Sequence, residues 1–258
     1  MEISGNTILI TGGGSGIGRG LAESFQKLGN QVIIAGRRQA LLNSVAAANP
    51  GLKSVVLDVQ DAREIKSFAL RMAEQFPSLN VLINNAGIMK PGNLNQANVD
   101  VSAAESMIET NLVAPMRLTA SLLPLLRKQP RATVMNVSSG LAFIPLAVTP
   151  TYCATKAAIH SYTQSLRYQL RDTSIEVMEL IPPYVATELS GARQGSDPNA
   201  MPLADFITEV MGILRTEPGA KEICVQRVLP LRFAARQEGA KYEEQFLSLN
   251  KFAAAAIV

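Results

Sequence analysis

The chain has 258 residues, of which 47% are hydrophobic and only 17% charged, against about 25% charged residues in an average protein. This composition excludes a disordered chain and allows one large core, since a single α/β domain often reaches about 250 residues. The net charge of +3 comes from scattered Lys and Arg residues rather than a basic run, so no nucleic-acid partner is expected.

Short apolar segments that are typical of buried strands alternate with longer segments in which apolar residues have helical spacing. Strands are expected at 7–11, 31–35, 53–58, 81–84, 133–137, 175–180 and 222–225. Helices are expected at 18–28, 39–48, 62–76, 102–126 and 152–171. This alternation predicts an α/β fold with a doubly wound parallel sheet, in one domain that spans 1–258. Residues 182–218, rich in Pro and Gly, interrupt the pattern and are expected to form a lid.

The sequence shows no clear targeting segment, membrane helix, disulfide motif or metal-binding motif. The strand-like residues 7–10 argue against a signal peptide, and the uncharged stretch 132–155 contains prolines that argue against a membrane helix. The two cysteines, Cys153 and Cys224, match no disulfide or metal motif, and they fit a reducing cytoplasm. Because the chain has a single His, neither a zinc site nor a Ser-His-Asp triad is expected, and no metal is predicted.

A glycine-rich turn, Thr-Gly-Gly-Gly-Ser-Gly-Ile-Gly at 11–18, joins the first strand to the first helix. Glycine permits positive φ and close approach of a phosphate, which the helix N-terminus attracts. A P-loop would need Lys and a hydroxyl after Gly18, but Arg19 and Gly20 follow, so a phosphotransferase is disfavoured. The turn therefore predicts a dinucleotide site, and the alternative is a tight turn without a ligand.

Arg37 and Arg38 follow the second predicted strand, where dinucleotide-binding folds select between NAD and NADP. An acidic residue there would bind a ribose hydroxyl, whereas guanidinium groups suit a 2′-phosphate. The sequence therefore predicts NADP(H) over NAD(H). The alternative is that one or both arginines are solvated.

Four residues suggest acid–base chemistry on a carbonyl group. Tyr152 and Lys156 share one face of a predicted helix, and a nearby ammonium lowers a phenol pKa from its usual value of about 10. Ser139 ends the fifth strand, where its hydroxyl could donate to a carbonyl oxygen. Asn111 lies four residues before Pro115, which has no N–H for the Asn111 carbonyl. That carbonyl could hold a water in a proton path, or the proline simply kinks the helix.

Together these motifs resemble the short-chain dehydrogenase/reductase family over roughly residues 5 to 190, and 84–87, Asn-Asn-Ala-Gly, is a further match. The resemblance implies a Rossmann-like sheet of seven parallel strands in a homodimer or homotetramer. It implies that Tyr152 exchanges the proton, that Lys156 holds the nicotinamide ribose and lowers the Tyr152 pKa, that Ser139 orients the substrate and that Asn111 holds a relay water. The residues expected to hold the cofactor are Gly12, Ser15, Gly16, Ile17, Gly18, Arg37, Arg38, Asp58, Val59, Asn85, Ala86, Gly87, Tyr152, Lys156 and Thr187.

The expected activity is hydride transfer between NADP(H) and a ketone, an aldehyde or a secondary alcohol. The alternative is a redox sensor that binds the dinucleotide without catalysis. The sequence departs from the family at Pro183, where glycine is usual, and in lacking a C-terminal Asp-Gly-Gly. Residues 222–236 resemble a bacterial branch called DltE-like, which implies no substrate. The candidates for a largely apolar substrate wall are Ile88, Met89, Leu141, Phe143, Pro183 and Tyr184.

The sequence assigns no definite function to His160, Cys153 or the C-terminal segment. His160 either joins a proton relay or is a packed helix histidine. Cys153 is expected to be a small buried residue. The alanine-rich C-terminus is either a docking segment or a frayed end.

Overall fold

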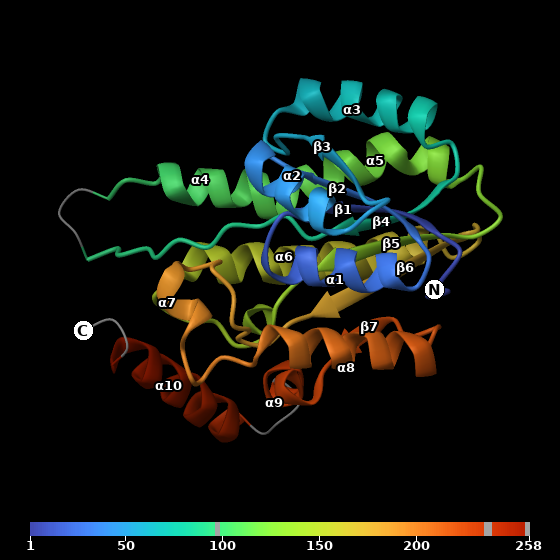
Figure 1. The fold of residues 1–258 in the computed structure, drawn as a ribbon. Helices are drawn as coiled ribbons and strands as arrows, with labels where there is room; N and C mark the ends of the chain where they lie inside the picture. Colours follow the sequence, from blue (N-terminus) through green and yellow to red (C-terminus); the bar gives the residue numbers. More distant parts are fainter. Residues whose placement is uncertain (96–98, 235–238, 256–258) are drawn as a thin grey trace.

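A parallel seven-stranded sheet forms the centre of the protein in a computed structural model that describes residues 1–95, 99–234 and 239–255 (Figure 1). The strands are β1 (Thr7–Thr11), β2 (Gln31–Gly36), β3 (Lys53–Val56), β4 (Leu79–Asn84), β5 (Ala132–Val137), β6 (Ile175–Ile181) and β7 (Glu222–Cys224). Their order is β3-β2-β1-β4-β5-β6-β7, and every neighbouring pair is parallel. The predicted doubly wound, Rossmann-like α/β domain is confirmed.

The helices of the strand–helix units are α1 (Gly16–Lys27), α2 (Gln39–Ala48), α3 (Ala62–Gln75), α4 (Ser102–Ile108), α5 (Ala114–Leu126) and α6 (Pro150–Gln169). The later helices are α7 (Ala192–Gly195), α8 (Leu203–Thr216), α9 (Leu229–Arg232) and α10 (Gly239–Ala255). Short helical turns are η1 (Glu109–Val113), η2 (Gly140–Ala142) and η3 (Gln226–Val228). None of the described helices combines the length and the apolar character needed to cross a bilayer.

Local signals explain where the first helices begin and end. Gly29 adopts a φ of +82°, and its N–H donates to the Gln26 carbonyl, which ends α1. The Asp61 carboxylate accepts from the N–H groups of Arg63 and Glu64 at 2.7 and 3.0 Å, which caps the start of α3.

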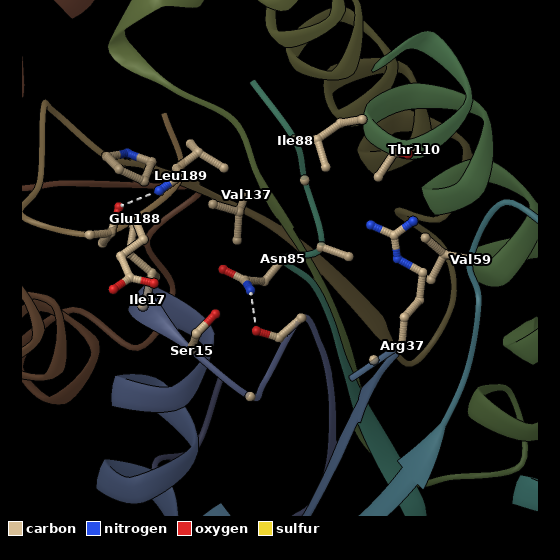
Figure 2. A pocket seen from close by; sticks show the side chains of 18 of the residues that line it. Ser15, Ile17, Arg37, Val59, Asn85, Ile88, Thr110, Val137, Glu188 and Leu189 are labelled. Carbon is tan, nitrogen blue, oxygen red and sulfur yellow. Dashed lines mark hydrogen bonds between the residues drawn. The ribbon is translucent and has the colours of Figure 1, made fainter. Parts of the chain in front are cut away.

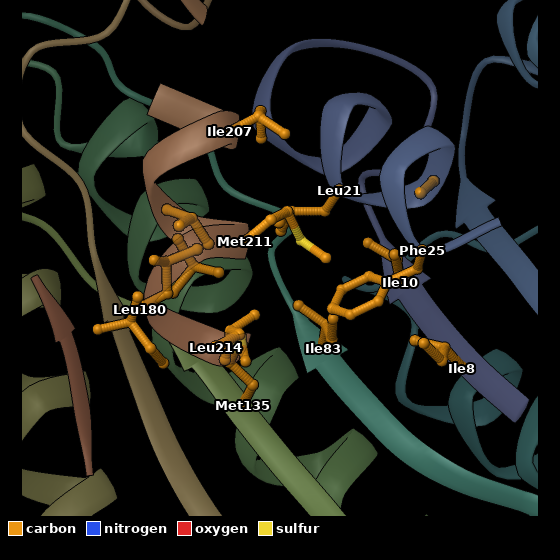
Figure 3. Packing of buried hydrophobic residues seen from close by; sticks show 14 of the residues in the cluster. Ile8, Ile10, Leu21, Phe25, Ile83, Met135, Leu180, Ile207, Met211 and Leu214 are labelled. Atoms are coloured by element: carbon orange, nitrogen blue, oxygen red, sulfur yellow. The ribbon is translucent and has the colours of Figure 1, made fainter. Parts of the chain in front are cut away.

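The core has two halves because successive residues of each strand face opposite sides of the sheet. Ile8 and Ile10 pack beneath α1, α2 and α8, whereas Leu9 between them packs beneath α3, α5 and α6. Figure 3 shows the first half, in which Leu21 and Phe25 of α1 and Met211 of α8 pack over the strands. This packing places the carboxyl ends of β1 and β4, where the strand order reverses, at one edge, the usual position of a ligand in such sheets.

Helix α8 was not predicted and shortens the expected lid. Phe206, Val210 and Leu214 are fully buried against the sheet, so the second part of 182–218 belongs to the core. Only the part before α8 runs along the carboxyl edge of the sheet. The four-residue spacing of the three apolar residues was a readable helix signal, but prolines and glycines surround it.

Candidate active site

One cleft of about 430 Å³ opens at the carboxyl ends of the strands, within the range of about 300–1,000 Å³ typical of ligand pockets (Figure 2). Almost all of the predicted site residues line it, so residues far apart in the chain share one surface. The lining includes Gly12, Ser15, Gly16, Ile17, Arg37, Arg38, Asp58, Val59, Asn85, Ala86, Gly87, Ser139, Tyr152, Lys156 and Thr187. Gly18 and Asn111 lie behind this surface and support it.

The glycine turn is shaped by close contacts that side chains would prevent. Gly12 and Gly16 have φ values of +67° and +53°, a region that favours glycine. A Cβ on Gly18 would lie 2.4 Å from Asn85 Nδ2 and 2.5 Å from the Gly12 oxygen. The Ser15 side chain does not cap α1, so the first N–H groups of this helix can bind an anion at the cleft.

Thr11 and Asn85 tie the glycine turn to the end of β4. The Thr11 hydroxyl accepts from the N–H groups of Asn85 and Ala86, each at 3.0 Å. Asn85, labelled in Figure 2, donates from Nδ2 to the backbone oxygens of Thr11 at 2.9 Å and of Gly12 at 3.4 Å. Sequence reasoning assigned Asn85 and Ala86 to the site but missed the role of Thr11, which fixes both.

The two arginines after β2 lie exposed at the mouth of the cleft. Arg37 lies beside Val59 (Figure 2), and Arg38 Nη2 donates to Ser15 Oγ at 2.9 Å. Among the residues whose side chains the structure describes, no carboxylate forms a salt bridge with either arginine. Both guanidinium charges therefore remain available to an anionic group.

Asp58 lies at the rim of the cleft, just beyond β3. Its Oδ1 accepts from the N–H of Gln60 at 3.0 Å. Gln60 Nε2 in turn donates to the hydroxyls of Ser106 and Thr110, at 2.8 and 2.7 Å. These contacts link this rim of the cleft to α4 and η1.

Tyr152 and Ser139 are both buried and lie in hydrogen-bond contact at the inner end of the cleft. Burial raises the pKa of the Tyr152 phenol above its usual value, while the hydrogen bond to Ser139 acts to lower it. Burial lowers the pKa of Lys156 to about 8, and the Glu179 carboxylate acts in the opposite direction.

The Lys156 ammonium is held at the end of β5, near the Tyr152 ring. It donates to the Val137 carbonyl at 2.8 Å and lies 5.6 Å from the centre of the Tyr152 ring. Burial has the largest effect on the pKa of the Tyr152 phenol and raises it, so the phenol keeps its proton at neutral pH.

Asn111 lies on η1, a π-helical turn inside the expected long helix 102–126. The Ala114 N–H donates to the Glu109 carbonyl five residues earlier, and Pro115 lies in the first turn of α5. The buried Asn111 amide contacts the backbone of Ile88 after β4, and its Nδ2 also donates to Thr155 Oγ1 at 3.2 Å. Neither a continuous α-helix nor a simple proline kink describes this segment, and π-helical turns are frequent at functional sites.

The segment after β6 covers one side of the cleft. Gln194 Nε2 donates to the Val185 carbonyl at 2.8 Å and to Thr187 Oγ1 at 3.1 Å. Thr187 thereby lies against Gly16, where an added Cβ would be 3.3 Å from Thr187 Cγ2. Sequence reasoning missed Gln194, whose role depends on how the loop folds back on itself.

Only part of the proposed substrate wall lies at the cleft. Ile88 and Pro183 line it, whereas the lining does not include Met89, Leu141, Phe143 or Tyr184. Tyr184 instead donates to Asp197 Oδ2 at 3.0 Å, and burial, followed by this contact, raises its pKa to about 12. Phe143 instead packs edge-on against His160, with ring centres 4.7 Å apart.

His160, Cys153 and the C-terminal helix do not line the cleft. His160 does not line it but binds Glu179, so the structure favours a packed histidine over a proton relay. Cys153 is buried, as expected, and burial raises the pKa of its thiol. The C-terminal segment is helix α10, in which Asn250 Nδ2 donates to the Pro145 carbonyl at 3.2 Å. Residues 256–258 of the expected tail and 235–236 of the segment 222–236 lie outside the described residues.

Comparison with known proteins gives a consistent result. Residues 6–197 match the family model described as short chain dehydrogenase. The chain is 41% identical over 253 residues to the uncharacterized oxidoreductase DltE of Bacillus subtilis, covering 97% of this chain and 98% of that protein. It is 32% identical over 202 residues to the NADP-dependent 3-hydroxy acid dehydrogenase of Schizosaccharomyces pombe, covering 76% and 78% of the two chains.

Solved structures share the fold at lower identity. A short chain dehydrogenase from Burkholderia cenocepacia in complex with NADP has a TM-score of 0.82 and 24% identity, with 96% of this chain and 99% of that chain covered. A short chain dehydrogenase/reductase from Burkholderia phymatum in complex with NAD has a TM-score of 0.76 and 22% identity, with coverage of 95% and 96%. At these identities the likeness concerns the fold alone.

Proposed function

The chain belongs to the short chain dehydrogenase family, and from this premise we propose that it is an NADP(H)-dependent reductase of ketones or aldehydes, or the corresponding alcohol dehydrogenase. One observation carries the proposal. A single cleft joins an anion-binding glycine turn at one end to the buried Ser139, Tyr152 and Lys156 at the other. A dinucleotide needs a phosphate site and a reactive site joined in this way.

The residues present fit NADP(H) in three places. The uncapped N-terminus of α1 suits the pyrophosphate, and glycines allow the backbone to approach it. Arg37 and Arg38 lack carboxylate partners in the described part of the chain and suit a 2′-phosphate. Thr187 and Lys156 line the inner end, where the nicotinamide riboside would be held. When bound, the nicotinamide supplies or accepts the hydride.

Tyr152 has the protonation state that carbonyl reduction requires. Because burial raises its pKa, the phenol remains protonated at neutral pH and can donate its proton to the carbonyl oxygen. The Ser139 hydroxyl, in contact with the phenol, would donate a second hydrogen bond to the same oxygen. After proton transfer, the nearby Lys156 ammonium stabilises the phenolate charge. The reverse sequence of proton transfers would serve alcohol oxidation.

The substrate proposed is small and largely apolar beside its carbonyl group. Ile88 and Pro183, which line the cleft, support this assignment. A homo-oligomer remains part of the proposal, from the family resemblance and the low charge content. A redox sensor is less favoured, because binding alone gives no reason to place a buried Ser, Tyr and Lys at the reactive end.

Parallel titrations with NADPH and NADH, followed by nicotinamide fluorescence, test the cofactor part of the proposal. We expect micromolar binding with a strong preference for NADPH. A preference for NADH would overturn the assignment of the arginines and leave the family unchanged. A panel of aldehydes and ketones with NADPH then tests turnover, and binding without any turnover would favour the sensor.

A further inference from the structure

A second group of ionisable side chains, carried by α6, β6 and β7, lies outside the cleft. The ligand atoms of His160, Glu179 and Glu222 lie within 4.8 Å of one another. Glu179, on β6, is fully buried, and both of its oxygens contact His160 Nδ1, at 2.8 and 3.0 Å. Arg232 donates to both oxygens of Glu222, at 2.7 and 2.8 Å. The Glu222 charge is therefore already paired, whereas His160 is the only described side chain within salt-bridge distance of Glu179.

Lys156 is a buried cation near this group of side chains. Its ammonium is buried, and it donates to the Val137 carbonyl. Among the side chains that the structure describes, no carboxylate lies within salt-bridge distance of this ammonium. A buried cation is unfavourable unless a charge of the opposite sign compensates it, and otherwise it loses its proton.

Backbone register brings Glu179 toward Lys156. Glu179 on β6 lies opposite Asn136 on β5, next to Val137, whose carbonyl accepts from the Lys156 ammonium. His160 is one helical turn after Lys156 on α6, so the partner of Glu179 and the lysine share a helix face. Of the carboxylates, Glu179 is the one whose field opposes the effect of burial on Lys156.

We propose that Glu179 is a positioning residue, held by His160, whose buried charge keeps the Lys156 ammonium protonated in the cleft. For its catalytic consequence this inference rests on the proposed function. The charged and titratable groups that act on Glu179 come from α6, β7 and α9. They are Lys156, His160, Arg167, Glu222, Cys224 and Arg232.

A purely structural role for Glu179 makes a different prediction. An ion pair that only fastens β6 to α6 would change stability when it is removed. It would leave the titration of Lys156 unchanged. The decisive readout is therefore the pKa of Lys156 itself, measured without cofactor.

The experiment is an NMR titration of the cofactor-free protein labelled with ¹³C-lysine, in which Lys156→Met identifies the Lys156 signal. In Glu179→Gln, which keeps the size of the side chain and removes its charge, the Lys156 pKa should fall by about one unit or more. Glu176→Gln, on the same strand but exposed, and Glu222→Gln, whose charge is paired with Arg232, should each shift it much less. An unchanged Lys156 pKa in Glu179→Gln would overturn the proposal.

A second variant applies if Glu179→Gln does not fold. Glu179→Met also removes the charge, but it needs no hydrogen-bond partner at this buried position, so the Lys156 pKa should fall as in Glu179→Gln. An unchanged Lys156 pKa in Glu179→Met would also overturn the proposal.

Activity separates this proposal from the proposed function. In NADPH-dependent reduction, the loss of kcat/KM at high pH should begin at lower pH in Glu179→Gln than in Glu222→Gln. A shifted Lys156 pKa in a protein without turnover would support the positioning role and count against the reductase. Turnover with an unshifted Lys156 pKa would do the opposite.

Discussion

The side-chain amide of Asn111 holds the backbone of Ile88 at both of its polar atoms. Asn111 Oδ1 accepts from the Ile88 N–H at 2.9 Å, and Nδ2 donates to the Ile88 carbonyl at 2.9 Å. Ile88 follows the Asn-Ala-Gly turn after β4 and lines the cleft. A π-helical turn thus fixes a loop that lines the cleft and follows a different element, β4.

Asn111→Ala should destabilise the protein and impair turnover. The substitution leaves a backbone N–H and a carbonyl without their partner, which costs about 1–3 kcal/mol per buried group. We expect a fall of at least about 2 kcal/mol in the free energy of unfolding, the low end for two groups because Ile88 is only half-buried, and a larger proportional loss in kcat than in NADPH affinity. Thermal melts and steady-state kinetics measure both effects, with Asn43→Ala on the exposed face of α2 as the control. Equal melting temperatures for the two variants would contradict this account.

The sheet was predictable from sequence because its strands are short apolar runs separated by strong turn signals. Gly29, for example, both ends α1 and allows the positive φ of the turn before β2. The π-helical turn η1 was not predictable, since one additional residue per turn does not alter a short apolar pattern. Pro115 indicated a break in the helix but not its geometry.

The site was predictable where its residues are close together in the chain and form a recognisable motif, as at the glycine turn and at Tyr152 and Lys156. It was not predictable where contacts join distant segments. Thr11 acts on residues 74 and 75 positions later, and Glu179 meets a histidine 19 positions earlier. The hydrogen bond from the Lys156 ammonium to the Val137 carbonyl depends on how α6 packs against β5, so it could not be deduced from spacing.

Tyr152→Phe should remove catalysis and leave cofactor binding nearly intact. The variant keeps the ring and loses the proton donor, which typically contributes about 10²–10⁴-fold to a rate. We expect kcat to fall by at least that range, while the Kd for NADPH changes less than about threefold. Tyr168→Phe, on the exposed part of the same helix, is the matched control. Near-normal kcat in Tyr152→Phe would remove this residue from the mechanism.

Arg37→Asp should reverse the preference between dinucleotides. The change removes a donor to a charged group, worth about 1.5–3 kcal/mol, and adds a carboxylate that repels a phosphate. The Kd for NADPH should therefore rise at least about ten- to one-hundredfold, and the Kd for NADH should stay constant or fall. Fluorescence titrations measure both constants, and Arg19→Ala, on the exposed side of α1, serves as the control. An unchanged ratio would show that Arg37 does not contact the 2′-phosphate.

Two glycines of the same turn should respond differently to alanine. In Gly18→Ala the new Cβ would meet the Gly12 backbone oxygen at 2.5 Å, so the turn must shift. In Gly14→Ala the nearest atoms are 3.5 Å away, an ordinary contact. We expect Gly18→Ala to lower the melting temperature and weaken NADPH binding, and Gly14→Ala to retain the melting temperature. Comparable melting curves for both variants would mean that the close packing of Gly18 is unimportant.

The buried Lys156 should make stability depend on pH in a defined window. Its pKa falls from the usual 10.5 to about 8 on folding, so the unfolded chain binds more protons between these values. Stability from this group therefore rises as pH increases through the window, by up to about 3 kcal/mol in total. Lys156→Met lacks this contribution, so the unfolding free energy of the wild type relative to this variant should increase between pH 8 and 10.5. Lys66→Met, at an exposed position of α3, should parallel the wild type. Denaturant titrations across the window test the sign, and parallel pH curves for the wild type and Lys156→Met would show that Lys156 keeps an ordinary pKa in the folded protein.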